Sequence, residues 1–455
     1  MQTPSARGLL KLALPIAAGM LSLSLLSLIE TIILGHYDQV ALAASAAANY
    51  VFFIFLSAFA GFAIAAQTQV ARHIETNKRL AHRFVQISTI QIVSCALFLI
   101  TTVHFFKTQI ISIQVNDPTL IKAGADYLQI KSWSVLPIAF LMALRGYWHG
   151  ANKPKTFLLC LLSSHISSAV FCYLLVNGKA GFPELGLNGA AIANLISISV
   201  GTCVLILLSR HVFKKASDSQ TLNSSDFKLG WQLAWPTSLQ QATFAVGTAA
   251  YMAIIGRLGI TELAAAHLLI TLSLVLILPV IGIGMAATTF ISQSFSRFQE
   301  SKSEAGISQQ WYKLAITLAC SIVFIIGISM LLLPEKILFI LTDEVDVVEA
   351  AYWSLLILAP SLLFEAFAIT TKQSLYAIRQ NKAVMKVLVI TQWGLLLPSM
   401  LLIHLSGHGS LEIYIVMHAA QRAINSIWLY RTWKREHKRQ LPNFDPSLSD
   451  IHKTN

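Results

Sequence analysis

The sequence predicts an all-α membrane protein in which twelve transmembrane helices form two pseudo-symmetric lobes of six helices, related by a parallel repeat. Three observations predict this fold: an apolar composition, twelve separate apolar segments and an internal repeat. Of the 455 residues, 55% are hydrophobic and only 12% are charged, and the mean hydropathy is +0.64. Soluble domains carry about 25% charged residues, so the composition is that of a protein embedded in a bilayer.

The apolar segments are separated by polar residues, glycine or proline, and each is long enough to cross a bilayer, which takes about 20 apolar residues. They define an N-terminal lobe (1–213), a cytoplasmic linker (214–228), a C-terminal lobe (229–433) and a basic cytoplasmic tail (434–455). We place the twelve spans at 9–34, 44–70, 84–106, 124–148, 156–177, 187–212, 229–256, 263–291, 311–333, 348–377, 384–405 and 411–430.

The distribution of lysine and arginine predicts the orientation of these spans. With a cytoplasmic N-terminus, 26 of the 33 basic residues fall on the cytoplasmic side and five on the other, while Lys131 and Lys372 lie within spans. Basic residues concentrate in cytoplasmic loops of membrane proteins, so we expect both termini in the cytoplasm. The basic tail follows a final span, where contact with anionic lipid explains it better than binding to nucleic acid does.

The internal repeat appears when residues 12–68 are aligned without gaps to residues 233–289, an offset of 221. Small and helix-breaking residues recur at the same depths, including Ala13 with Ala234, Pro15 with Pro236 and Gly61 with Gly282. Because each half has six spans, both halves start on the same side of the membrane and the repeat is parallel. Two such lobes around a central cavity suit transport by alternating access.

Two carboxylates stand out because they lie clearly within spans: Glu30 and Glu365, out of 21 acidic residues. A carboxylate in hydrocarbon costs about 2.5–3.5 kcal/mol on insertion scales, so it faces a cavity or a partner and often has a function. Burial favours the neutral form of a carboxyl group, as a reversible proton carrier requires. Glu30 therefore couples transport to protons, or it is a structural carboxylate paired across helices.

Several longer segments resemble the multidrug and toxic compound extrusion (MATE) family. They are LALPIAAGMLSLSLLSLIETIILGH followed by LAASAAA in the first two spans, then ALRGYWHGANKPK (143–155) and GFPELGLNGAAIAN (181–194). The resemblance covers essentially the whole chain. It implies a secondary antiporter, with no cofactor beyond a coupling ion, that exports small cationic amphipathic substrates in exchange for protons or sodium ions. It further implies a monomer in the lipid bilayer of the bacterial inner membrane.

The resemblance also assigns roles to residues of the N-terminal lobe. In many members an aspartate at the position of Glu30 carries the ion coupling, and an Asn, an Asp and a Thr on neighbouring helices extend its polar network. Those positions hold Ser168, Cys172 and Asn194 here. The second carboxylate is missing, and a sodium ion prefers several oxygen ligands, so the sparse set favours protons.

In the C-terminal lobe, Glu365 matches a position where one branch of the family carries an aspartate. Lys372 follows seven residues later, about two turns along the same helix face. Glu365 is thus a cation-binding carboxylate or half of a structural pair with Lys372. Gln240 and Gln241 lie one turn before the position where that branch has a glutamate, and they line the cavity or bond across helices.

Two other classes of function compete with export. A flippase for lipid-linked precursors would need a strongly cationic cavity for pyrophosphate, whereas the chain offers mainly Lys131, Arg145 and Lys372, opposed by two glutamates. An integral membrane enzyme would need clustered catalytic groups, and the sequence contains no GxxxxGK[ST], HExxH or GxSxG pattern. No metal site is predicted either.

Overall fold

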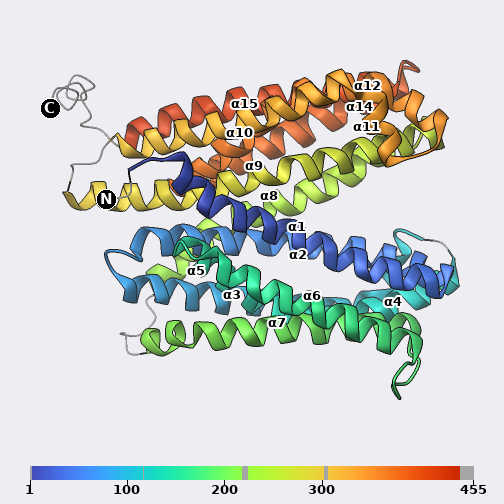
Figure 1. Ribbon diagram of the computed structural model, residues 1–455, viewed down its shortest axis with the longest axis horizontal. Helices are drawn as coiled ribbons and strands as arrows, with labels where there is room; N and C mark the ends of the chain where they lie inside the picture. The colour runs from blue at the N-terminus through green and yellow to red at the C-terminus, as the bar shows by residue number, and fades with distance from the viewer. Residues whose placement is uncertain (1–2, 116, 218–223, 302–305, 441–455) are drawn as a thin grey trace. The chain divides into compact units, whose positions relative to one another are not determined.

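A computed structural model of the chain describes residues 3–115, 117–217, 224–301 and 306–440, and its regular secondary structure is helical (Figure 1). These residues divide into two compact units. One unit runs from Ala18 to Ala242; the other joins the residues up to Ala17 with those from Thr243 onward. The units therefore divide inside two helices rather than in the predicted linker. Parts of the predicted linker (218–223) and tail (441–455) lie outside the described residues.

The unit from Ala18 to Ala242 contains most of the first eight helices. The bounds of these helices are α1 Ala6–Tyr37, α2 Gln39–His73, α3 Lys78–Ser112, α4 Pro118–Ser132, α5 Val135–Gly150, α6 Pro154–Asn177, α7 Gly186–Ser217 and α8 Ser224–Ile255.

The other unit contains the remaining helices, together with the start of α1 and the end of α8. Their bounds are α9 Ile260–Ser301, α10 Ile307–Leu332, α11 Pro334–Leu341, α12 Val345–Ala377, α13 Asn381–Val389, the π-helix η1 Ile390–Leu396, α14 Leu397–Leu405 and α15 Leu411–Gln440.

Short polar side chains start several of the helices. The carboxylate of Asp38 accepts a hydrogen bond from the Ala41 amide at 2.8 Å, and the Asn77 side chain accepts one from Leu80 at 3.0 Å. These side chains satisfy backbone donors that have no partner in the first turn of a helix. At the other end of α6, Gly178 adopts a left-handed conformation with φ of 63°, which only glycine adopts without steric cost.

Each of the twelve predicted spans falls on a helix or on a broken helix, which confirms the all-α class. Within the described residues, eight helices are long and apolar enough to cross a membrane, and α4 with α5 forms a ninth, bent pair. The other three predicted spans coincide with α1, α8 and α15, which are 32, 32 and 30 residues long. At 1.5 Å per residue, about 20 helical residues already cover the hydrocarbon.

Two of the predicted spans are not continuous α-helices, contrary to expectation. Span 124–148 breaks between α4 and α5, which meet at 48°. Span 384–405 contains the π-helix η1 just before Pro398, and proline cannot donate the backbone hydrogen bond that an α-helix needs at that point. Irregular turns of this kind are common at functional positions in helices.

The internal repeat has a structural counterpart in two close helix contacts. A Cβ atom on Gly61 of α2 would lie 2.6 Å from the Ala234 carbonyl oxygen of α8. A Cβ atom on Gly282 of α9 would lie 2.8 Å from the Ala13 carbonyl oxygen of α1. The two contacts join residues that the offset of 221 makes equivalent, so each contact is the repeat image of the other.

Replacing either glycine by alanine should destabilise the protein, because the added methyl group has no room against a backbone. We expect Gly61→Ala and Gly282→Ala each to cost about 1–3 kcal/mol, which is typical of overpacking, and to lower the unfolding temperature in detergent. Gly35→Ala is the matched control, since the nearest atom to its Cβ would be a flexible Leu42 methyl at 3.7 Å. Equal unfolding temperatures for all three variants would contradict the close contact.

Candidate functional site

A buried polar cluster in the first unit brings together Glu30 of α1, Asn49 of α2, and Tyr127 and Lys131 of α4. The Lys131 ammonium lies 2.9 Å from Glu30 Oε2 and 3.1 Å from Glu30 Oε1. Glu30 and Lys131 are each only 4% exposed. The cluster thus holds a full negative and a full positive charge, and its net charge is zero.

Every donor of the lysine has an acceptor in this cluster. Besides Glu30, the ammonium donates to Asn49 Oδ1 and to the Tyr127 hydroxyl, both at 2.5 Å. Tyr127 in turn donates to Glu30, and the Asn49 amide donates to Glu30 Oε1 at 3.4 Å. An ammonium has three donors, so Lys131 can donate to the Glu30 carboxylate, the Asn49 amide oxygen and the Tyr127 hydroxyl at the same time.

Two aromatic rings also lie close to the ammonium. The Nζ atom of Lys131 lies 4.9 Å from the centroid of the Tyr127 ring and 5.6 Å from that of Phe52. Cations within about 6 Å of a ring centroid are attracted to the electron-rich face of the ring. The rings therefore add attraction for a cation at this place while excluding water.

The local structure of α4 positions the two residues that it contributes. Tyr127 and Lys131 are four residues apart, which puts both on one face of the helix. The helix begins at Pro118 after Asp117, whose carboxylate accepts hydrogen bonds from the backbone amides of Thr119 at 2.7 Å and Leu120 at 3.3 Å. Hydrogen bonds from the Thr119 hydroxyl and from these amides lower the pKa of Asp117. The charged cap thus holds α4 at one end, and the bend after Ser132 ends it at the other.

The other predicted residues of the first unit are buried or partly buried, and among the described residues no hydrogen bond joins Ser168, Cys172 or Asn194 to Glu30. Cys172 lies close enough to Glu30 and Lys131 to interact with both charges. Ser168 and Asn194 are 3% and 6% exposed. Gln240 is 3% exposed and Gln241 is partly buried. The network is thus made by α1, α2 and α4 rather than by α6 and α7, which carry Ser168, Cys172 and Asn194.

Asn49, Tyr127 and Lys131 are site residues that the sequence did not predict. One signal could have found them: Lys131 is the one lysine well inside a predicted span of the N-terminal half, as Glu30 is the one carboxylate. A buried charge needs a partner, so the two residues are expected to pair. Tyr127 then follows from its place one turn before Lys131. The sequence contains no such signal for Asn49.

In the second unit, the partner of Glu365 is Arg422 rather than Lys372. The Arg422 Nε atom lies 3.5 Å from Glu365 Oε2, and another guanidinium nitrogen donates to the Ser361 hydroxyl at 2.9 Å. Within the described residues no ion pair joins Glu365 to Lys372. Arg422 lies eleven residues into α15, and its side chain is 9% exposed. The predicted orientation counts Arg422 among the cytoplasmic basic residues, although this residue lies inside the predicted span 411–430.

The surroundings of Arg422 are polar and aromatic. One turn before it, His418 of α15 packs on Tyr251 of α8, with ring centroids 5.2 Å apart. One turn after it, Asn425 accepts a hydrogen bond from Thr391 in the π-helix at 2.7 Å. Glu365 keeps a side-chain exposure of 30%, so this carboxylate is more accessible than Glu30.

The MatE family model matches the chain in two segments, residues 15–174 and 236–401. The chain belongs to the MATE family. The two matched segments begin at Pro15 and Pro236, which are 221 residues apart and are equivalent in the internal repeat. Members of this family are transporters, so the chain is a multi-pass membrane transporter and not an enzyme.

Curated relatives and solved structures agree with this assignment. The chain is 22% identical over 393 residues to a probable multidrug resistance protein NorM of Thermotoga maritima, covering 86% of this chain and 84% of the relative. It is 23% identical to a probable NorM protein of Bacillus cereus, covering 84% and 85%. A crystal structure of MATE in a bent conformation superimposes with a TM-score of 0.84 at 16% identity, covering 95% of this chain and 96% of the other.

A second solved structure shows the same fold. A mutant of the Vibrio cholerae MATE transporter VcmN matches at 16% identity with a TM-score of 0.84, and the match covers 97% of this chain and 98% of the other. Within the described residues, no group of three or more histidine, cysteine, aspartate or glutamate side chains could hold a metal ion.

Removing one partner of the Glu30–Lys131 pair should destabilise the protein more than removing both. We expect Lys131→Met to cost about 3–5 kcal/mol, because it leaves a buried carboxylate uncompensated. Glu30→Gln combined with Lys131→Met should recover most of that loss, as measured by thermal unfolding in detergent.

Lys107→Met is the matched control for this comparison, because it removes a lysine from a more exposed pair, with Asp126 of α4 at 2.6 Å. An exposed pair contributes about 1 kcal/mol or less. A Lys131→Met variant as stable as Lys107→Met would show that Glu30 and Lys131 do not depend on each other.

Proposed function

We propose that the protein exports cationic amphipathic compounds across the bacterial inner membrane by alternating access, in exchange for protons. The observation that supports proton coupling is that the Lys131 ammonium already binds the oxygens of Glu30, Asn49 and Tyr127, which a metal ion would need as ligands. The curated relatives are named multidrug resistance proteins, which supports small-molecule drugs as substrates. The lysine distribution supports cytoplasmic termini, and we expect a monomer.

The coupling follows from the net charge of the cluster. With Glu30 ionised, Glu30 and Lys131 sum to zero, and a cationic substrate can approach without electrostatic cost. When Glu30 binds a proton, its negative charge is lost and the Lys131 ammonium leaves a net charge of plus one. Like charges repel strongly where the dielectric is low. Proton binding from outside therefore expels the cationic substrate, and proton release inside restores the neutral cluster.

Sodium coupling fits this arrangement less well. A hard cation would need several oxygen ligands at once. The four oxygens of this cluster, two from Glu30 and one each from Asn49 and Tyr127, already bind the Lys131 ammonium. A sodium ion would have to displace the Lys131 ammonium, which is covalently attached to α4. A proton needs only one lone pair on the carboxylate, which the network can supply.

The alternative of a flippase for lipid-linked precursors is also less well supported. A pyrophosphate group would need unpaired cations inside the lobes. Here Lys131 is neutralised by Glu30, and Arg422 lies beside Glu365. Of the cations that the sequence offers, only Arg145 and Lys372 then have no ion pair among the described residues, which is little positive charge to hold a polyanion.

Transport assays in proteoliposomes test the proposal. Ethidium efflux should run when a proton gradient alone is imposed, and should stay at the background rate under a sodium gradient at equal pH on both sides. Glu30→Gln should abolish the proton-driven efflux, because it removes the group that carries the proton. Lys107→Met, which removes a lysine outside the cluster, should keep it. Efflux driven equally well by sodium would overturn proton coupling.

The net charge of the cluster also predicts how strongly substrate binds. Glu30→Gln removes the negative charge and leaves the charge of Lys131 uncompensated, so ethidium should bind this variant in detergent more weakly than it binds the wild-type protein at the same pH. Lys107→Met should bind ethidium as the wild-type protein does. Fluorescence titration with ethidium measures the three affinities, and equal affinities of Glu30→Gln and the wild-type protein would contradict the charge-based coupling.

A further inference from the structure

The C-terminal half of α15 carries basic side chains that have no acidic partner among the described residues. Arg431 and Lys434 are exposed, and the described chain provides no ion pair for either. In contrast, Arg435 and Arg439 contact Glu436 at 2.8 Å and 3.3 Å. Burial lowers the pKa of nearby His437 to about 4, so this imidazole is uncharged at neutral pH. Lys438 is likewise exposed and has no ion pair among the described residues, but of these three basic residues only Arg431 and Lys434 line a groove.

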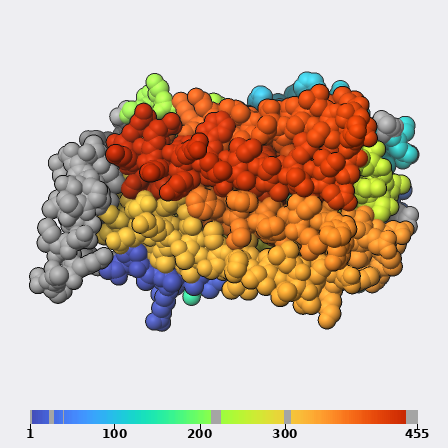
Figure 2. Space-filling model, turned by 90° about the horizontal axis from the view of Figure 1, so that it is seen from above, coloured from blue at the N-terminus to red at the C-terminus, as the bar shows by residue number. Residues whose placement is uncertain are grey.

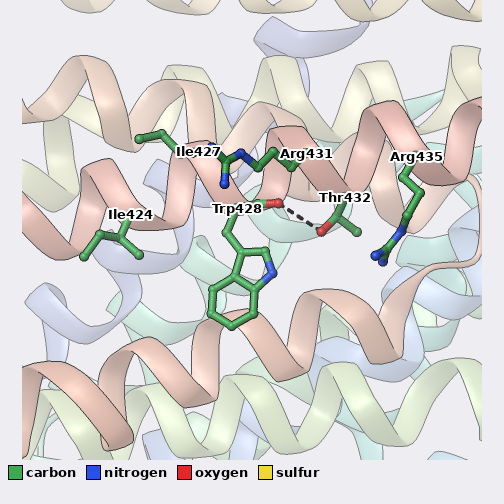
Figure 3. A pocket seen from close by; sticks show the side chains of 6 residues that line it. All are labelled: Ile424, Ile427, Trp428, Arg431, Thr432 and Arg435. Carbon is green, nitrogen blue, oxygen red and sulfur yellow. Dashed lines mark hydrogen bonds between the residues drawn. The ribbon is translucent and has the colours of Figure 1, made fainter.

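Two grooves flank this part of α15, and both include Arg431. The first has a volume of about 490 Å³, and its lining residues are shown in Figure 3: Ile424, Ile427, Trp428, Arg431, Thr432 and Arg435. In Figure 3 the apolar residues and Trp428 precede the two arginines along the helix. Ile427 and Arg431 are four residues apart and form the ridge between the grooves, because both belong to each lining.

The second groove is larger and extends over three helices. Its volume is about 700 Å³, and it lies against Cys320 of α10, Phe364 and Phe367 of α12, and α15. Its basic end is formed by Arg431 and Lys434, and the rest of its wall is mainly aliphatic or aromatic. Figure 2 shows α15, in red, exposed along one face of the molecule.

Aromatic packing gives the basic end a fixed wall. Tyr430 packs edge-on against Phe367 with ring centroids 5.8 Å apart, and Trp433 stacks on Tyr312 of α10 at 4.5 Å. Trp433 therefore holds this turn of α15 level with the start of α10. From there the groove runs back along α15 toward Ser426, in the direction of the apolar part of the helices. Positive charge lies at one end and an apolar channel leads away from it.

We propose that these grooves bind an anionic phospholipid, with its phosphate on Arg431 and Lys434 and an acyl chain along Phe364 and Phe367. Charge decides between the candidate occupants. A cationic drug would be repelled by two unpaired basic groups, whereas a phosphate is attracted by about 1 kcal/mol for each such group near the membrane surface. An acyl chain in the second groove would cover the aromatic rings of Phe364 and Phe367. The lipid would thereby fasten α15 to α10 and α12.

Native mass spectrometry of the full-length protein with phosphatidylglycerol and phosphatidylcholine tests this proposal. The wild-type protein should retain phosphatidylglycerol in preference to phosphatidylcholine. Arg431→Gln with Lys434→Gln should weaken phosphatidylglycerol binding about thirtyfold. The matched control, Lys438→Gln with Arg439→Gln, removes the same charge from the same helix outside both grooves and should retain the preference. Size-exclusion chromatography confirms that both variants are folded.

Three outcomes would overturn the proposal. An equal loss in the two double variants would mean diffuse attraction to the basic end of α15 rather than a groove. Equal retention of both lipids by the wild-type protein would mean that no anionic site exists. Displacement of phosphatidylglycerol by millimolar glycerol phosphate would mean that the phosphate alone binds and that the acyl chain does not lie in the groove.

Discussion

The buried pair of Glu30 and Lys131 is an electrostatic constraint on the first unit. An isolated charge in a low-dielectric interior costs several kcal/mol even after relaxation, so neither residue could occupy its position alone. The pair requires α1 and α4 to meet, and the remaining donors and acceptors require Asn49 and Tyr127 beside them. Once these helices are fixed, the break after Ser132 allows the chain to continue into α5 at a different angle.

The two halves of the repeat keep the same helix contacts but differ in their charges. Gly61 and Gly282 make equivalent close contacts with the backbones of α8 and α1. The repeat position of Glu30, however, is Tyr251, whose ring packs on His418. The second unit has instead a carboxylate at Glu365, beside Arg422 of α15. A small residue is needed wherever two helices pack closely. A charged side chain is not required for that packing, so the charged positions can differ between the two halves.

The charges of the chain thus have different surroundings at different places. Inside the units, Lys131 and Arg422 lie beside carboxylates, so that protonation of a carboxyl group changes the net charge of a site by one full unit. On α15, Arg431 and Lys434 lack an acidic partner within the described residues and face open grooves. In the functions that we propose, the first arrangement serves the binding of protons and cations, and the second serves the binding of an anion. Both use the same residue types, and the presence of a nearby carboxylate decides which behaviour results.

The sequence by itself determined the all-α membrane fold, the positions of the twelve spans and the repeat. These features depend on local hydropathy, because a stretch of apolar residues that crosses the bilayer must pair its own backbone groups in a helix. It also determined that Glu30 and Glu365 were unusual, since a carboxylate within an apolar span is costly wherever it lies. Only the tertiary structure decided their partners. Lys131 is 101 residues from Glu30 and Arg422 is 57 residues from Glu365, and contacts over such distances depend on how helices pack and where α4 and η1 break. The same reason explains why Lys372, which is close to Glu365 in sequence, does not pair with it.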